Sequence, residues 1–177
     1  MRTQILLSSS ILVLLLFCHS GSCASDGFSV VQCGSDIPVN LIGQTMTNER
    51  VVVIEERYKN LGLKDLGGTE ISERLFLSSW QICGDEYELL EKNGIVRDVL
   101  KFPPHSKRTP QFIGSCEIRG HELPGSIIAV LDGKEGAEKL PAKVAWKIDK
   151  KRAKFIKLPT EGLLCPLSGV ITADGGL

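Results

Sequence analysis

The placement of six cysteines constrains this chain most, because two of them lie in an N-terminal segment with the pattern of a removable leader. Arg2 precedes an apolar run over residues 5–17, and small residues at Ser22 and Ala24 fit the requirements of signal peptidase. The run is interrupted by serines and is shorter than the roughly 18 apolar residues that cross a bilayer. We therefore expect residues 1–24 to be a signal peptide that is cleaved after Ala24.

After cleavage, residues 25–177 would form a single exported domain that retains Cys33, Cys83, Cys116 and Cys165. An even number of cysteines in an exported chain favours disulfides over free thiols. Four cysteines allow three pairings. We prefer Cys33–Cys83 with Cys116–Cys165, because each half of the domain then has its own cross-link. No two of the cysteines have the short spacing of a zinc knuckle, so we expect neither a metal site nor a cofactor.

The charge balance limits the classes of partner. Loss of the leader removes Arg2 from the 21 basic residues and leaves all 21 acidic residues, so the mature net charge is about −1. This value argues against general binding of nucleic acid. No later stretch is long and apolar enough to span a membrane. We expect a protein secreted to the cell exterior or to a periplasm.

The first part of the mature chain has one helix pattern and one strand pattern. Residues 35–38, Ser-Asp-Ile-Pro, favour a helix start, and Gly43 favours its end. Residues 50–55 are rich in valine and isoleucine, which predicts a buried strand. The glycines of residues 60–68 indicate turns around a short helix.

Strand patterns then dominate. Apolar alternation over residues 75–90 shifts phase twice, which predicts bulges near Ser78-Ser79 and near Gly84-Asp85. Asn93-Gly94 lies between two apolar runs, and this dipeptide predicts a tight hairpin.

Later segments add strands around a proline-rich connection. Three prolines within residues 102–110 exclude a central strand or a helix interior, so this segment is predicted to be an exposed connection. The apolar patterns predict strands at residues 111–119 and 126–131. They also predict a second hairpin at residues 145–149 and 153–158. The predicted fold is β-dominated α+β, an antiparallel sheet of six or seven strands with one or two short helices.

Catalytic residue patterns are lacking, so we predict no catalytic site. His105 and His121 lie among turn residues, where an exposed histidine is the more common outcome. Glu86 and Glu88 would share one side of a strand, and we interpret that side as a solvated acidic face. The nucleophile and metalloprotease motifs are absent.

Two basic segments are candidate binding sites. Lys107-Arg108 lies between prolines that would hold it extended, either as a protease-directed segment or as a plain connection. The second hairpin carries further cations, which would contact an anionic surface or protein, or would protect an edge strand from aggregation. Its candidate residues are Lys147, Lys150, Lys151, Arg152 and Lys154.

These patterns favour a small exported binding or inhibitor-like domain that acts through surface contacts with a protein or an anionic surface. Exported, strand-rich domains with polar loops commonly place binding residues on loops held by a rigid sheet. The alternative is a secreted or periplasmic hydrolase whose site is not recognisable from sequence.

Overall fold

The structure is a computed structural model that describes residues 26–133, 137–166 and 170–171; the predicted leader lies outside this range. The helical elements are η1 (Gly27–Val30), α1 (Ile37–Leu41), α2 (Val51–Arg57) and η2 (Lys59–Leu61). The strands are β1 (Lys64–Ser72), β2 (Leu75–Ile82), β3 (Asp85–Lys92), β4 (Ile95–Phe102), β5 (Gln111–Gly114), β6 (Glu117–Ile118), β7 (His121–Glu122), β8 (Ile127–Leu131), β9 (Lys139–Asp149), β10 (Lys154–Leu158), β11 (Leu163–Pro166) and β12 (Val170–Ile171).

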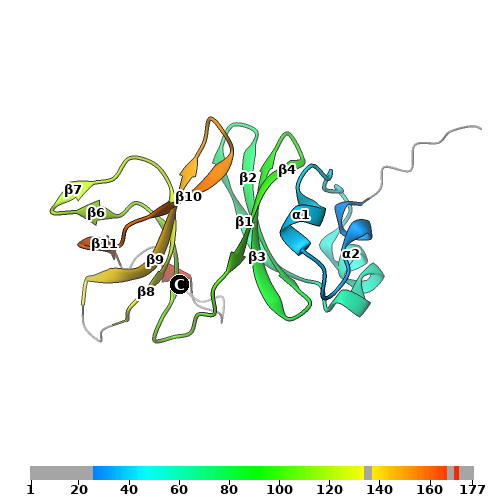
Figure 1. The fold of residues 1–177 in the computed structure, drawn as a ribbon, viewed down its shortest axis with the longest axis horizontal. Coiled ribbons are helices and arrows are strands. Elements are labelled where there is room, and N and C mark those ends of the chain that lie inside the picture. Colours follow the sequence, from blue (N-terminus) through cyan, green and yellow to red (C-terminus); the bar gives the residue numbers. More distant parts are fainter. Residues whose placement is uncertain (1–25, 134–136, 167–169, 172–177) are drawn as a thin grey trace, which may run out of the picture.

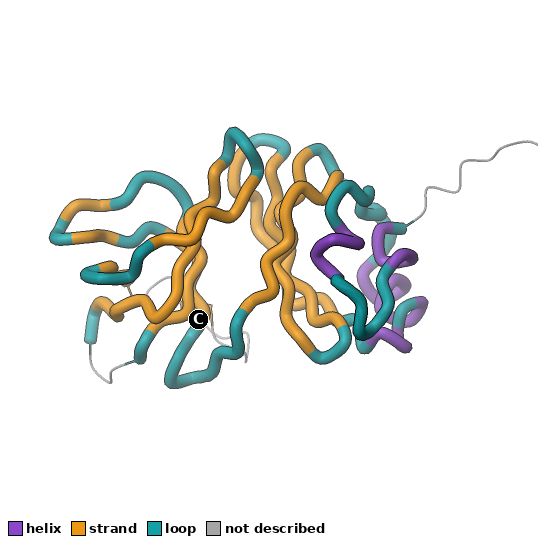
Figure 2. Tube along the Cα trace, viewed as in Figure 1, coloured by secondary structure: helices purple, strands orange, loops and turns teal. Residues whose placement is uncertain are grey.

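The strands form two antiparallel sheets, which confirms the β-dominated class. The first sheet is a meander in the order β1-β2-β3-β4. The second has the order β12-β5-β8-β9-β11-β6-β7, and β10 pairs with β9. The two sheets face each other, and the short helices cover the outer face of the first sheet (Figures 1 and 2).

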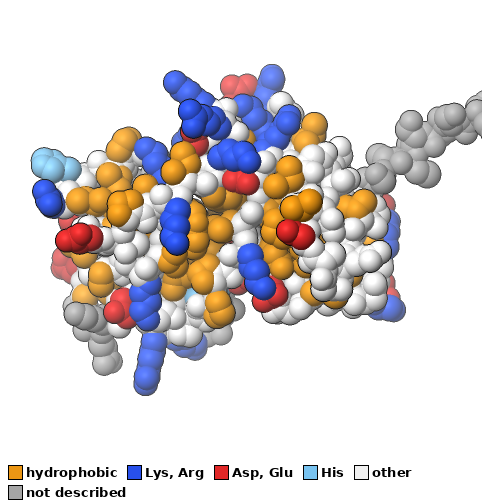
Figure 3. Space-filling model, in the orientation of Figure 1, with side chains coloured by type: hydrophobic (Ala, Val, Ile, Leu, Met, Phe, Trp, Pro, Cys, Tyr) orange, Lys and Arg blue, Asp and Glu red, His pale blue; other side chains and the backbone are white. Residues whose placement is uncertain are grey.

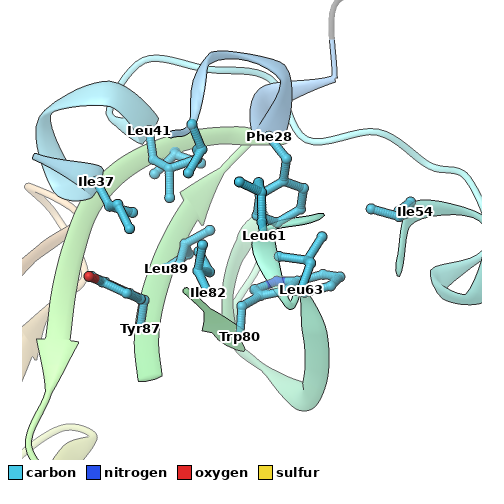
Figure 4. Packing of buried hydrophobic residues seen from close by; sticks show 12 residues of the cluster. Phe28, Ile37, Leu41, Ile54, Leu61, Leu63, Trp80, Ile82, Tyr87 and Leu89 are labelled. Carbon is cyan, nitrogen blue, oxygen red and sulfur yellow. The ribbon is translucent and has the colours of Figure 1, made fainter. Parts of the chain in front are cut away.

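Three apolar cores fill the layers between and outside the sheets. The first lies between the helices and the first sheet, where Phe28, Leu41 and Leu61 meet Trp80 and Leu89 (Figure 4). The second joins the two sheets, and we call this interface the seam; its buried members are Leu75, Leu77, Leu90, Phe102, Ile128, Val130, Ile148 and Ala153. The third lies on the other face of the second sheet.

Both preferred disulfides are confirmed. Cys33–Cys83 ties the segment after η1 to the β2–β3 turn and spans 50 residues of sequence. Cys116–Cys165 spans 49 residues and lies buried in the core of the second sheet. Cross-links of this length restrict the unfolded chain in each half separately.

The predicted hairpins are also confirmed. Asn93 and Gly94 have φ angles of 55° and 72° between β3 and β4, as a two-residue turn with two left-handed residues requires. Strands β9 and β10 pair from Lys154 with Asp149 to Leu158 with Ala145, as the second predicted hairpin requires. The predicted helix begins at Ile37, where the Asp36 side chain accepts a hydrogen bond from the Val39 N–H (3.2 Å).

The strand predicted at residues 50–55 is wrong, because this segment is helix α2. Only Ile54 is buried, whereas Val52 is 63% exposed. The last residue, Arg57, pairs with Asp26 (3.3 Å) and Glu49 (2.7 Å). Valine and isoleucine favour strands when they pack on a pleated surface with partners, and this segment has none, so local propensity is overridden.

The bulge predicted near Gly84-Asp85 is wrong, and the register shift beside Ser79 has its extra residue, Leu66, on β1 rather than on β2. Strands β2 and β3 pair without a register shift, and Gly84 belongs to the turn between them. The phase shift arises because both faces of β2 are buried: Leu77 faces the seam, and Trp80 faces the helices. The register shifts of this sheet lie in the β1–β2 and β3–β4 pairings instead.

Among the described residues, no helix has the length and hydropathy to cross a bilayer.

Candidate functional site

Three hairpin turns lie side by side at one end of the molecule. The N–H of Asn93, in the β3–β4 turn, donates to the Arg74 carbonyl in the β1–β2 turn (3.0 Å). Lys92 Nζ donates to the Lys151 carbonyl in the β9–β10 turn (3.4 Å). Both sheets therefore contribute to one surface.

This surface gathers cationic side chains, and we call it the basic tip. Figure 3 shows lysine and arginine side chains concentrated at this end of the molecule. Acidic side chains at the same turns are Glu73 and Asp149, and Asp149 is engaged by the backbone N–H groups of Lys151 and Arg152 (3.0 Å each). The members of the basic tip are Arg74, Lys92, Lys150, Lys151 and Arg152.

Backbone bonds hold the turn that carries three of these cations. The two N–H bonds to Asp149 lower the pKa of this carboxyl, with the Arg152 N–H as the largest cause. Lys150 Nζ donates across the seam to the Ile71 carbonyl (3.0 Å). Arg152 Nε lies 3.8 Å from Asp149 Oδ2, and the Arg152 side chain remains 79% exposed. The turn therefore has a backbone fixed by hydrogen bonds and an arginine that is accessible to solvent.

Two predicted binding residues of the same hairpin lie apart from the tip. Lys147 is half-buried on β9 with Ile127 as its register partner, on the outer side of the second sheet. Lys154 lies 3.6 Å from Asp98 of β4 and so forms part of the seam. The structure therefore groups only part of the predicted basic hairpin.

The Lys107-Arg108 segment lies near the other end of β4, beyond Phe102. It forms a tight turn rather than the expected extended segment, since Ser106 and Thr109 exchange two backbone hydrogen bonds (3.0 and 3.1 Å). The Arg108 carbonyl accepts a further bond from the Gly133 N–H (2.8 Å). A backbone bonded in this way is not free to pair as a strand with another chain.

A buried carboxylate occupies the seam near the proline-rich connection. Glu88 of β3 is fully buried, and its Oε2 accepts from Ser79 Oγ of β2 (2.7 Å). Its Oε1 accepts from Gln111 Nε2 of β5 (2.6 Å), which crosses from the second sheet. The predicted solvated acidic face is therefore wrong at Glu88, because the second sheet covers that face of β3.

Glu86 and His105 lie beside this carboxylate. His105 Nε2 is 2.9 Å from Glu86 Oε2, and both side chains are largely covered. The His105 ring also meets Phe102 edge-on, with centroids 5.7 Å apart. The expected exposure of His105 is therefore wrong, since the connection folds back over the first sheet. The hydrogen bond to Glu86 raises the pKa of His105.

Burial raises the pKa of Glu88 from its ordinary value of 4.5 to about 7, and the Glu86 charge acts in the same direction. The hydrogen bonds from Ser79 and Gln111 and the nearby His105 oppose this shift and are outweighed. A carboxyl with few cationic neighbours and no water contact favours its neutral form. Glu88 is thus a group that exchanges a proton near neutral pH.

The second histidine, His121, is exposed as predicted. It lines an open cleft of about 510 Å³ together with Arg119 and Leu123 from the β6–β7 hairpin and Glu161 from the turn before β11. Over the described parts of the chain, no cluster of three or more histidine, cysteine or acidic side chains is arranged to hold a metal ion.

Sequence reasoning missed Arg74, Lys92 and the burial of Glu88. Arg74 and Lys92 belong to turns far apart in the sequence, and only the pairing of the sheets brings them to the β9–β10 turn. A sign for Glu88 was present, because β3 carries apolar residues in both phases, Leu89 and Leu90. Such a strand is buried on both faces.

Comparison with protein-family models, with curated protein sequences and with solved structures finds no match to this chain.

Proposed function

We propose that this chain is an exported binding domain that recognises an anionic polysaccharide through its basic tip. One observation carries the proposal: three hairpins from two sheets present five cationic side chains on one surface, although the whole chain has no net charge. Local concentration of one charge sign raises the local concentration of a partner of opposite sign. The two disulfides are compatible with an extracellular location.

The form of the surface favours a charged polymer over a small ligand. The cations lie on protruding turns, so a linear chain of sulfate or carboxylate groups would meet several of them at once. Each exposed ion pair contributes about 0 to 1 kcal/mol, so affinity depends on several pairs acting together and declines with salt. Arg74 and Arg152 lie 3.6 and 3.8 Å from Glu73 and Asp149 through their Nε atoms, but both side chains are largely exposed. Guanidinium groups bind such oxyanions bidentately.

The other predicted roles have less support from the geometry. An inhibitory segment at Lys107-Arg108 would have to offer an extended backbone, and this backbone is closed into a turn. One contact supports the alternative of a hydrolase, namely the 2.9 Å hydrogen bond between His105 Nε2 and Glu86 Oε2. However, the nearby Ser79 hydroxyl and Glu88 are buried, so a substrate would reach them only after the sheets separated.

The proposal is tested by affinity for a sulfated polysaccharide such as heparin, measured by titration calorimetry and by the salt concentration that elutes the protein. The tip variant Lys151→Glu/Arg152→Glu should bind at least 10-fold more weakly than the native domain. The matched control is Lys64→Glu/Lys157→Glu, which makes the same change in net charge at exposed residues outside the tip. We expect the control to retain most of the affinity.

Two outcomes would overturn this function. The first is equal affinity of the tip variant and the native domain for the polysaccharide, which would show that the basic tip is not the binding site. The second is binding to vesicles of anionic phospholipid or to a poly-glutamate peptide without binding to the polysaccharide. Binding to the vesicles alone would identify the partner as a lipid surface, and binding to the peptide alone would identify it as an acidic protein. In both cases the basic tip would remain the binding surface.

A further inference from the structure

Glu88 lies between the two sheets and takes no part in the basic tip. Its carboxylate is held by one donor from each sheet, Ser79 from the first and Gln111 from the second. Gln111 is itself buried, and it begins the strand that follows the proline-rich connection. The Glu88–Gln111 bond is therefore a buried polar bridge across the seam.

The surroundings of Glu88 contain few charges. On its own strand the neighbour on the same face is Glu86, and the connection contributes His105. The adjacent strands contribute Ser79 and, from β4, Leu100 as its register partner. From the second sheet, β5 contributes Gln111; the uncharged Ile113 of the same strand packs against the apolar part of the seam. Among the residues that the structure describes, the hydrogen-bond partners of Glu88 are the uncharged Ser79 and Gln111, and His105 bonds to Glu86 instead.

The neutral and ionised forms of Glu88 differ in the hydrogen bonds that they make and in the charge that they bury. The neutral acid can donate its O–H to Ser79 Oγ while the other oxygen still accepts from Gln111, so every polar group keeps a partner and no charge is buried. The ionised form accepts both bonds, but it leaves a negative charge in the seam beside Glu86. An ionised carboxylate out of water and without a paired cation is strongly disfavoured.

We propose that Glu88 is a proton-operated latch that holds the two sheets together in mildly acidic surroundings and weakens the seam when its proton leaves. The raised pKa of Glu88 supports the latch, and the raised pKa of His105 acts in the same sense. The latch is independent of the proposed function, because it requires no ligand at the basic tip.

The direction of the pH dependence follows from linkage. The pKa of Glu88 is higher in the folded chain than in the unfolded chain, so its neutral form stabilises the fold. This stabilisation is complete below the ordinary value near 4.5 and is lost as the pH rises through about 7. The unfolding equilibrium constant should therefore increase on the order of 50-fold between pH 5 and pH 8 through this group alone.

The test is urea unfolding of the full domain with its disulfides intact, at pH 5 and at pH 8. Glu88→Gln mimics the neutral acid, because its amide can donate to Ser79 while its carbonyl accepts from Gln111. This variant should lose most of the pH dependence and should be more stable than the native domain at pH 8. Glu70→Gln, at an exposed carboxylate of β1, is the matched control and should keep the native pH dependence.

A second measurement keeps the proposal testable if Glu88→Gln fails to fold. The side-chain carboxyl carbon of Glu88 is followed by NMR in the native domain, where we expect a titration midpoint near 7. In Glu86→Gln the midpoint should fall, because the neighbouring negative charge is gone. A midpoint below 5 in the native domain, or a Glu88→Gln variant with unchanged pH dependence, would overturn the latch.

Discussion

The two ends of the seam are held by different kinds of contact. At the connection end, a fully buried Glu88 bridges the sheets through Gln111 (2.6 Å). At the hairpin end, Asp98 of β4 accepts from the Phe155 N–H (2.8 Å) and lies 3.6 Å from Lys154 Nζ. The first contact buries a carboxyl group without a bonded cation, whereas the second pairs the largely covered Asp98 carboxylate with the half-exposed Lys154.

Each end of the seam is therefore sensitive to a different solution condition. Burial removes the screening effect of salt, so the connection end responds to protonation. The Lys154 side chain is 53% exposed, so solvent and ions screen its attraction to Asp98 and the hairpin end responds to salt. Between them lie apolar side chains, Leu77 and Leu90 among them, whose contribution depends on neither.

The largest effect on stability is expected from the apolar side chains in the middle of the seam, between its two ends. Leu90→Ala removes a fully buried side chain and should destabilise the fold by about 2 to 5 kcal/mol at every pH and salt concentration. Urea unfolding measures this loss. Val52→Ala, at a 63% exposed residue of α2, is the control and should change stability by less than about 0.5 kcal/mol. If the loss of stability in Leu90→Ala varied strongly with pH, the apolar middle of the seam would not be independent of the ionisable groups at its ends.

The next effect belongs to the connection end. Gln111→Ala removes the donor from the second sheet and should cost about 1 to 3 kcal/mol, with the larger loss above pH 7, where Glu88 is ionised. Stability curves at pH 5 and pH 8 separate the lost hydrogen bond from the cavity, because the cavity contributes equally at both. Gln81→Ala, on β2, serves as the control. Equal losses for Gln111→Ala at the two pH values would contradict the assigned bond.

At the hairpin end we expect a smaller effect with the opposite sensitivity. Asp98→Asn keeps an acceptor for the Phe155 N–H but removes the charge that faces Lys154, and it should cost less than about 1 kcal/mol. The loss should shrink in 1 M salt, where the Asp98–Lys154 pair is screened. Thermal unfolding at low and high salt measures the loss, and a loss that did not change with salt would show that the two ends do not differ as described.

The smallest effect is expected for Lys150, which donates to the Ile71 carbonyl from an exposed position (3.0 Å). Lys150→Met keeps most of the side-chain length and should change stability by about 0.5 kcal/mol or less. Hydrogen exchange of the β9–β10 amides is the more sensitive measurement, with slightly faster exchange expected. Faster exchange throughout the first sheet would instead give this contact a larger role in closing the seam.

Local patterns predicted the elements whose geometry is decided by near neighbours. Asn93-Gly94 can adopt the two left-handed conformations of a tight hairpin turn, and Asp36 can cap the helix that follows it. The prediction failed at residues 50–55, where Val51 and Val52 lack a strand partner and stay exposed on α2. It failed again near Gly84-Asp85, where burial of both faces was interpreted as a bulge.

The candidate sites divide in the same way. Lys150, Lys151 and Arg152 were predicted together because they are consecutive residues of one turn. Arg74 and Lys92 join them only through contacts between hairpins. Glu88 was placed on the correct strand, but its environment depends on Gln111, which lies 23 residues away in the other sheet.

The sequence by itself determined the β-dominated class and the two main hairpins, because turn chemistry and strand alternation act over a few residues. It left three cysteine pairings possible, and the structure decided between them, because each disulfide joins residues about 50 positions apart. Only the tertiary structure decided which strand faces are covered and which turns meet. These features depend on how two sheets pack, and packing joins residues that no local pattern relates. The basic tip and the buried Glu88 both arise at that level.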